Sequence, residues 1–280
     1  MGSGAGPRYC FAMRLRASLA LLAVLAPPLA AQDRIPSHCI ALSEAPARVM
    51  TASFRDPVAA DAVRITFVDH AMFLIQAGDV AAATDFTGFL GNVDFLPDVV
   101  TMNNAHGTHW TRAPDPAIPH VLQGWPQDGA RADHYLDLGD MLIRNVTTDR
   151  RLGGGGMLPD GNSIFVFEAA GLCIAHLGHL HQPLGDAQVA RLGRMDVVMV
   201  PVDGGLTLDL PTMLSVIDRL QARIVIPMHW FGRGTLEAFV AEMSDDFAID
   251  RRPGNSVTLT LADLPDRPTV LLLEPAFLAD

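Results

Sequence analysis

The sequence contains no lysine, so all 20 of its basic residues are arginine. Enzymes that form a Schiff base, or that use a lysine amine as nucleophile or base, are therefore excluded. Positive charge is scarce overall, because 31 acidic residues leave a formal net charge of −11. Proteins that bind nucleic acids neutralise phosphates with a basic surface. This charge balance argues against a nucleic-acid partner and leaves a small-molecule partner as the expectation.

Long apolar segments are also missing. Residues 13–32 read MRLRASLALLAVLAPPLAAQ, in which two arginines precede a short apolar run and small residues precede Gln32. This is the pattern of a secretory signal peptide, residues 1–31, with cleavage expected after Ala31. A membrane span needs about 20 apolar residues. We therefore predict a periplasmic or secreted protein with no stable membrane span after cleavage, and an uncleaved anchor is the alternative.

Cysteine is rare as well. Cys39 and Cys173 remain after the expected cleavage, and two cysteines in an exported protein can form a disulfide. Alternatively Cys173, inside the apolar segment GLCIAHL, is simply a buried strand residue. We favour the buried strand residue, because the sequence does not place Cys39 beside it.

The remaining sequence has the composition of a folded α/β protein, with 49% hydrophobic residues. Apolar segments between turn residues predict strands within 63–86, 97–104 and 134–178. Apolar periodicity then predicts helices over 186–193, 207–222 and 235–243, which alternate with buried strands over 195–202 and 223–230. Residues 109–133, rich in proline, tryptophan and histidine, predict an ordered loop insertion. This order favours a single domain, residues 32–280, with two sheets covered by helices.

Histidines follow the ends of three apolar segments, VVTMNNAHGTH, LCIAHLGHLH and IVIPMHW. Sheet folds collect binding sites at strand ends, where loops converge over a rigid base, so these histidines can meet in space. Neutral imidazoles bind zinc and neighbouring transition metals. The candidate ligands are His106, His109, His179 and His229. The isolated histidines His38, His120 and His134 are interpreted as ordinary core or surface residues.

Five segments in a fixed order point to a known family. They are VDHAMFLIQAGDVAAATDF, VVTMNNAHGTHW, GLCIAHLGHLHQPL, MDVVMVPVDGG and IPMHW. They resemble, in turn, the GHASFLI…DP, ISHxHxDH, HLGD, VDVLLIPVGG and IPMHY segments of the metallo-β-lactamase superfamily, specifically its ascorbate-6-phosphate lactonase-like branch. The resemblance runs from about Val63 to the C-terminus. It implies an α/β fold, a four-layer αβ/βα sandwich with the site along one edge of its two sheets.

The resemblance also implies metal-binding roles for particular positions, and this chain has other residues at several of those positions. The HxHxDH segment of the family gives two histidines to one metal ion, and its Asp and last His to a second. Asn104 and Thr108 replace the first His and the Asp here, and His179 replaces the bridging Asp of HLGD. Residues 149–151, DRR, stand where a further histidine is expected. His70 and Asp85 match the opening hairpin, and Asp85 is expected to hold the histidine loop by hydrogen bonds.

Electrostatics favours one metal ion over two. Two divalent ions about 3.5–4 Å apart repel strongly, and dinuclear sites offset the repulsion with carboxylates and a bridging hydroxide. This sequence has lost both expected carboxylates and gained a neutral imidazole. We predict one divalent transition-metal ion, zinc in the first place, with manganese, iron or copper as alternatives. The predicted ligands are His106, His109, His179 and His229, assisted by Asn104 or His181.

The predicted function is an exported metal-dependent hydrolase of a small ester, lactone or phosphoester. Four histidines can close a tetrahedral shell, so catalysis needs a fifth position or a weak ligand. Asp149 or Asp203 is the predicted general base or proton shuttle, and ordinary solvated loop acids are the alternative. The alternative function is a non-hydrolytic protein that binds a metal or a small molecule and has lost the dinuclear site.

Overall fold

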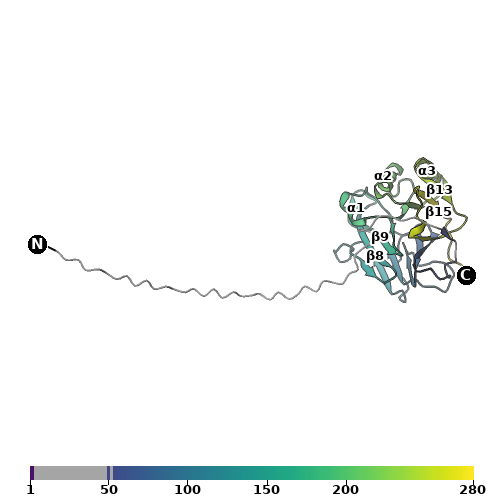
Figure 1. Cartoon of the computed structure of the whole chain (residues 1–280), viewed down its shortest axis with the longest axis horizontal. Coiled ribbons are helices and arrows are strands. Elements are labelled where there is room, and N and C mark those ends of the chain that lie inside the picture. The colour runs from purple at the N-terminus through teal and green to yellow at the C-terminus, as the bar shows by residue number, and fades with distance from the viewer. Residues whose placement is uncertain (3–48, 51–52) are drawn as a thin grey trace. The chain divides into compact units, whose positions relative to one another are not determined.

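The structure, a computed structural model, describes residues 1–2, 49–50 and 53–280 (Figure 1). Apart from residues 1–2, the predicted signal peptide lies outside the described residues, and so do His38 and Cys39. The chain divides into two units, residues 1–34 and 35–280. Every helix and strand of the described residues belongs to the second unit. None of these helices combines the length and the apolar character needed to cross a membrane.

Two β-sheets form the frame of the second unit. The strands of the first sheet are, in order, β1 (Val49–Met50), β14 (Ser256–Thr260), β2 (Ala62–Asp69), β3 (Met72–Ala77), β4 (Val80–Ala83), β5 (Val99–Met102) and β6 (His120–Gln123). Those of the second are β13 (Ala248–Arg251), β15 (Thr269–Leu272), β12 (Ile224–Met228), β11 (Val197–Pro201), β10 (Leu172–His176), β9 (Met157–Ala169), β8 (Leu142–Arg151) and β7 (Tyr135–Asp137). Parallel pairing aligns β4 with β5 in the first sheet and β10, β11 and β12 in the second. Their C-terminal ends therefore open at a common edge within each sheet.

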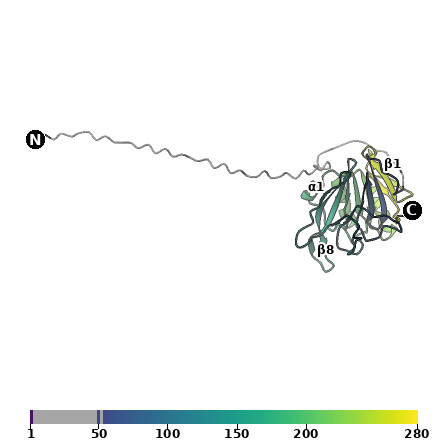
Figure 2. The same cartoon turned by 90° about the horizontal axis from the view of Figure 1, so that it is seen from below.

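The two sheets pack face to face through one apolar layer. Phe67 and Phe73 of the first sheet and Phe165 and Phe167 of the second are almost completely buried in it. Successive strand residues point to opposite faces, so each strand gives alternate side chains to this layer. In Figure 2 the blue strands of the first sheet and the green strands of the second lie side by side. Burial on this scale fixes the sheets relative to each other and makes their edge a rigid base for loops.

Three helices cover the other face of the second sheet (Figure 1). They are α1 (Asp186–Leu192), α2 (Leu210–Leu220) and α3 (Arg233–Met243), and a short 3₁₀ helix, η2 (Leu261–Asp263), follows β14. All three predicted helices are present. α2 begins later than predicted, because the Asp209 side chain accepts a hydrogen bond from the Thr212 amide and Pro211 favours the first turn.

The outer face of the first sheet is covered differently. Its buried side chains, such as Met102 and Val100, pack against loop residues that include Phe86, Leu90 and Ile118. The predicted α/β fold of metallo-β-lactamase type is confirmed, but within residues 53–280 this fourth layer consists of loops instead of helices. The segment 109–133 contributes a strand, β6, to the edge of the first sheet, so the predicted insertion is more than a loop.

Cys173 lies completely buried in β10, as expected for a strand residue. It is also disulfide-bonded, so the two alternatives for Cys173 do not exclude each other. Cys39 lies outside the described residues.

Candidate metal centre

The predicted site residues come from loops that leave the two sheets. Their positions are His70 in the turn between β2 and β3, Asp85 after β4, His106 and His109 after β5, His179 after β10, Asp203 after β11 and His229 after β12. Because these loops leave neighbouring strand ends, residues up to 159 positions apart in the sequence (70 to 229) meet at one place.

Three of these residues have an unusual backbone conformation. The φ angles of His70, Asp85 and His229 are 43°, 42° and 60°, in the left-handed region that residues with a Cβ atom rarely adopt. Each such residue costs of order 1–3 kcal/mol and persists only where its surroundings hold it. One such restraint is visible, because the His229 amide donates to the His70 carbonyl at 2.8 Å. Strained backbone conformations that cluster in one place are typical of functional sites.

Asp85 and His109 form the first of two carboxylate–imidazole pairs. Both side chains are fully buried, and His109 Nδ1 donates to Asp85 Oδ2. The other carboxylate oxygen, Oδ1, accepts the Asn103 amide at 3.0 Å. Burial raises the pKa of Asp85 to about 7, against the opposing effects of His176, the Asn103 amide and His229. Asp85 therefore fixes the orientation of His109, as the sequence predicts for it.

Asp203 and His229 form the second pair. Asp203 Oδ2 lies 2.8 Å from His229 Nδ1, and both side chains are buried. Asp203 Oδ1 accepts the amides of Gly205, Leu206 and Thr207 at 2.9, 2.7 and 3.0 Å. Burial alone would raise the pKa of Asp203, but the hydrogen bonds from His229 and these amides outweigh it and lower that pKa. Asp203 is thus a fixed anion that orients His229.

The two pairs meet at their imidazoles. The Nε2 atoms of His109 and His229 lie 3.0 Å apart. Where both carboxylates are ionised they only accept hydrogen bonds, so each Nδ1 then carries the ring proton and each Nε2 presents a lone pair. Two lone pairs facing each other inside a protein are not complementary. A cation between them makes the arrangement favourable.

The donor atoms fit a transition-metal ion. Imidazole nitrogens bound at about 2.0–2.1 Å in a tetrahedral shell lie about 3.3 Å from each other, close to the 3.0 Å between these two atoms. His70 Nε2 and His179 Nδ1 are buried and without a hydrogen-bond partner among the described residues. The ring centroids of His70 and His179 lie 4.0 and 4.9 Å from that of His229.

Two overlapping groups of three histidines have donor atoms within 4.8 Å of one another, namely His70, His109 and His229, and His106, His109 and His179. Both groups contain His109. Because Asp85 takes Nδ1 of His109, only Nε2 can bind an ion. His109 can therefore serve as a ligand in only one of the two groups at a time.

Three imidazoles of this cluster, those of His70, His109 and His179, are held in their neutral form. Burial lowers the pKa of His70 to about 3 and lowers the pKa of His109 and of His179 well below its ordinary value, with neighbouring histidines adding to the effect. Metal binding requires neutral imidazole, so no proton has to be removed at neutral pH. His70, which the sequence places as a supporting residue, thus lies among the candidate ligands.

Asn104 and His181, the predicted assisting ligands, are engaged elsewhere. Asn104 Oδ1 accepts Arg150 Nη1 at 3.2 Å. His181 Nδ1 accepts the Arg151 amide at 3.0 Å, and its Nε2 donates to the Leu206 carbonyl at 3.1 Å. In this arrangement both ring nitrogens of His181 are used, and Arg150 takes one of the two lone pairs of Asn104 Oδ1.

Asp149, a predicted general base, has hydrogen-bond partners outside the cluster. Its Oδ1 accepts the Asp160 amide at 3.0 Å across the β8–β9 ladder, and its own amide donates to Gln182. Asp203, the other predicted base, orients His229 and accepts three backbone amides.

Sequence reasoning missed three residues that build the site. Asn103 gives its amide to Asp85, and its Nδ2 donates to the Ser163 carbonyl at 2.8 Å. A Cβ atom on Gly178 would lie 2.0 Å from that Nδ2, so only glycine fits there. His176 Nε2 donates to the Ala71 carbonyl at 2.7 Å, which ties the two sheets together beneath the site. The third residue, Arg150, carries a positive charge to the loop of His106.

Comparison with known proteins agrees with this geometry. The sequence profile of the β-lactamase superfamily domain matches residues 64–229, more than half of the chain. The chain belongs to the metallo-β-lactamase superfamily. The match begins in β2 and ends on His229, so it contains every histidine of the cluster.

Relatives place this superfamily member beside proteins named for metal-dependent hydrolysis. A protein of Methanosphaerula palustris, named a UPF0173 metal-dependent hydrolase, is 26% identical over 183 residues, 60% of this chain and 84% of that protein. A Thermotoga maritima structure assigned as a zinc-dependent hydrolase of the superfamily is 26% identical, with a TM-score of 0.55 over 76% of this chain and 98% of that one. A structure from Parabacteroides distasonis, with 14% identity, a TM-score of 0.50 and coverage of 65% and 89%, shares the fold.

Exposed apolar side chains surround the histidine cluster of this superfamily member. Phe231 is 68% exposed, and its ring centroid lies 5.0 Å from that of His70 and 5.5 Å from that of His229. Leu206 is 60% exposed, on the loop whose carbonyl holds His181.

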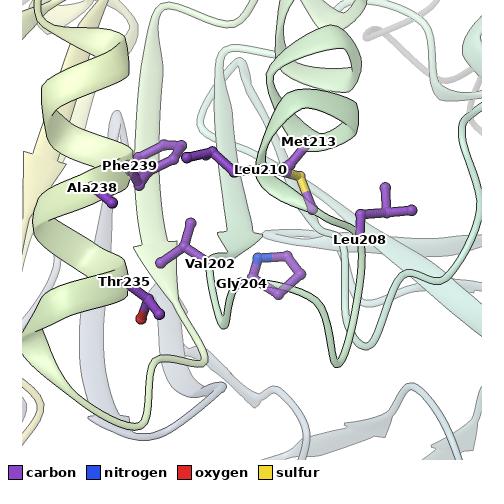
Figure 3. A pocket seen from close by; sticks show the side chains of 9 residues that line it. Val202, Gly204, Leu208, Leu210, Met213, Thr235, Ala238 and Phe239 are labelled. Atoms are coloured by element: carbon purple, nitrogen blue, oxygen red, sulfur yellow. The ribbon is translucent and has the colours of Figure 1, made fainter.

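A separate cavity of about 70 Å³ lies behind the Asp203 loop, between α2 and α3. Figure 3 shows Met213 of α2 and Phe239 of α3 on either side of it, with Val202 and Gly204 between them. Its lining is apolar and includes none of the candidate ligands. We therefore regard this cavity as a packing space between helices and place the chemistry at the histidines.

The Asp203–His229 pair yields a first prediction. Asp203→Asn retains the size of the side chain but removes the charge that orients His229, so the affinity for Zn²⁺ should fall about 10–100-fold. Competition with a chromophoric chelator measures this affinity. Asp245→Asn, an exposed acid on the far side of α3, is the matched control. Equal affinities of Asp203→Asn and the unaltered protein would contradict an orienting role.

Proposed function

We propose that the chain is an exported metal-dependent hydrolase that uses one histidine-held ion to cleave a small ester, lactone or phosphoester. The observation that carries the proposal is the pair of Nε2 atoms, 3.0 Å apart, whose imidazoles are each tied to a carboxylate. Relatives named as metal-dependent hydrolases support the reaction class. The lactone option rests on the sequence resemblance to the ascorbate-6-phosphate lactonase-like branch.

A single ion is proposed for two reasons. His109, shared by both groups of candidate ligands, has only Nε2 free, so it can serve one ion. The second reason is electrostatic, because the Arg150 guanidinium contacts Asn104 and Ala105 and brings a positive charge next to the loop that carries His106. Another cation at that point would be repelled. Zinc fits an all-imidazole set, and manganese, iron and copper remain alternatives.

The ligand set is proposed to be His109, His229 and His179, with His70 or His106 completing it. Such an ion, when bound, supplies Lewis-acid chemistry, which activates water and polarises the bond to be broken. The residues of the chain do the rest. Asp85 and Asp203 hold the two central imidazoles in place, and Phe231 and Leu206 border the approach with apolar surface. His106 is the exposed imidazole of the cluster and faces an incoming molecule.

A second candidate function, metal or small-molecule binding without hydrolysis, is favoured by one specific observation. The carboxylates of Asp85 and Asp203 are held by imidazoles and amides, and Asp149 accepts the Asp160 amide. A general base must reach the proton it abstracts, directly or through one water. Asp85 and Asp203 already accept these hydrogen bonds, so neither is free to act as that base, and this favours binding without hydrolysis.

Metal loading and hydrolysis can be tested together. Protein purified without an affinity tag and reloaded with Zn²⁺ is expected to hold about one equivalent by elemental analysis. It should hydrolyse at least one of a p-nitrophenyl ester, a bis-p-nitrophenyl phosphodiester and a γ-lactone. In His109→Ala the rate of hydrolysis should fall more than about 100-fold, because this variant lacks the imidazole common to both ligand groups. His120→Ala, on the edge strand β6, is the control.

The two candidate functions give different outcomes. One equivalent of metal without hydrolysis of any of the three substrates would favour the binding function. A hydrolysis rate that is equal in the unaltered protein and in His109→Ala would rule out the proposed use of the histidine cluster.

Export is supported by the sequence pattern of residues 13–32. If a bacterial host secretes the chain, N-terminal sequencing of the exported protein should begin at Gln32, since small residues precede it. Recovery of the chain only in the cytoplasm with its N-terminus intact would contradict export.

A further inference from the structure

Arg150 is a cation without a counter-charge at the border of the histidine cluster. It lies near the end of β8, and its Nη1 donates to Asn104 Oδ1 at 3.2 Å and to the Ala105 carbonyl at 3.3 Å. The next residue, His106, is a candidate metal ligand. Within residues 53–280 no carboxylate forms an ion pair with Arg150.

The donors of Arg150 are only partly used. Nη1 is the only one of its nitrogens with a hydrogen bond among the described residues, and Nε is buried without a partner. Asn104 Nδ2, on the side chain that Arg150 contacts, is likewise a buried donor without a partner. Two unsatisfied donors and one positive charge thus lie next to each other. The Nε–Nη2 edge of a guanidinium is the geometry that binds carboxylate or phosphate in a bidentate manner.

Two other arginines of β8, Arg144 and Arg151, have a structural role, and their hydrogen-bond partners can be compared with those of Arg150. Arg144 donates to Glu168 at 2.7 Å and to the carbonyls of Arg191 and Leu192 at 2.8 and 2.7 Å, through three different nitrogens. Arg151 directs its Nη2 at three successive carbonyls of residues 205–207. Arg150 has neither a carboxylate nor a comparable set of carbonyls. Its free edge is therefore not explained by packing.

We propose that Arg150, with Asn104, binds an anionic oxygen of the substrate, so that the molecule cleaved at the histidine cluster also carries a carboxylate or phosphate group. This inference rests on the proposed hydrolase function and narrows its substrate class. The ligand would complete the hydrogen bonds of Arg150 Nε and Asn104 Nδ2. The carboxylate oxygens of Asp85 and Asp203 already accept hydrogen bonds from His109, from His229 and from backbone amides. An anion therefore meets attraction from Arg150 without an opposing free carboxylate.

Binding can be measured apart from hydrolysis. Protein freed of metal with EDTA and dialysed is titrated calorimetrically with inorganic phosphate and, separately, with succinate, so that a bound metal ion cannot attract the anion. At least one of the two anions is expected to bind, and the better one identifies the preferred anionic group. Arg150→Gln should weaken this binding by about tenfold or more. Arg150→Lys keeps the positive charge but lacks the planar guanidinium. Its affinity for the anion should lie between that of the unaltered protein and that of Arg150→Gln.

Arg251→Gln is the matched control. Arg251 lies on β13, at the opposite edge of the second sheet, and forms an exposed ion pair with Glu237 of α3. This variant should bind the anions like the unaltered protein. Circular dichroism and the thermal midpoint of each variant establish that it is folded. If Arg150→Gln does not fold, Arg150→Lys decides the result. Undiminished anion binding by a folded Arg150 variant, or no binding of either anion by the unaltered protein, would overturn the proposal.

Substrate preference gives a second readout. In Zn²⁺-loaded protein, the ratio of kcat/KM for the mono-p-nitrophenyl ester of succinate to that for p-nitrophenyl acetate should exceed one and should fall several-fold in Arg150→Gln. A ratio that Arg150→Gln leaves unchanged would count against the proposal while hydrolysis itself stands. Absence of hydrolysis of both esters would instead count against the proposed function, and the calorimetric result would still decide the role of Arg150.

Discussion

The contact on which the site depends is between two imidazoles that face each other through Nε2, each held from behind by a buried carboxylate. Asp85 fixes His109 and Asp203 fixes His229, so the separation of 3.0 Å between the two Nε2 atoms is set by the protein. Orientation by outer partners is what makes a histidine a selective ligand. With both carboxylates ionised, two lone pairs face each other in a buried space, and a cation between them makes that arrangement favourable.

The rest of the fold keeps this contact in place. Packing of the two sheets places the loops after β4 and β5 opposite those after β10, β11 and β12. Left-handed backbone at His70, Asp85 and His229 bends the chain at the β2–β3 turn and at the loops after β4 and β12. The cost of these conformations, of order 1–3 kcal/mol each, is offset by a deeply buried core. The packing of the sheets thus holds the chain in backbone conformations that these residues would not adopt on their own.

Much of this could be predicted from the sequence, because the signals are local. Apolar periodicity marks α2 through Met213, Ile217 and Leu220, and histidines directly after buried strands mark the cluster. The hydrogen-bond partners of the individual side chains could not be predicted, because they depend on contacts between loops that are distant in the sequence. Arg150 reaches Asn104 across 46 residues, and His181, which has the appearance of a ligand in HLGHLH, uses both ring nitrogens on Arg151 and Leu206. The loop layer over the first sheet has no periodic signal at all.

The most direct test of the account is anomalous scattering from a crystal of the protein reloaded with Zn²⁺, measured on both sides of the zinc absorption edge. The account predicts one peak, at about 2.0–2.1 Å from Nε2 of both His109 and His229. Two peaks about 3.5–4 Å apart would indicate a dinuclear site and contradict the single-ion account. A peak distant from both imidazoles, or none, would contradict the assignment of these histidines as ligands.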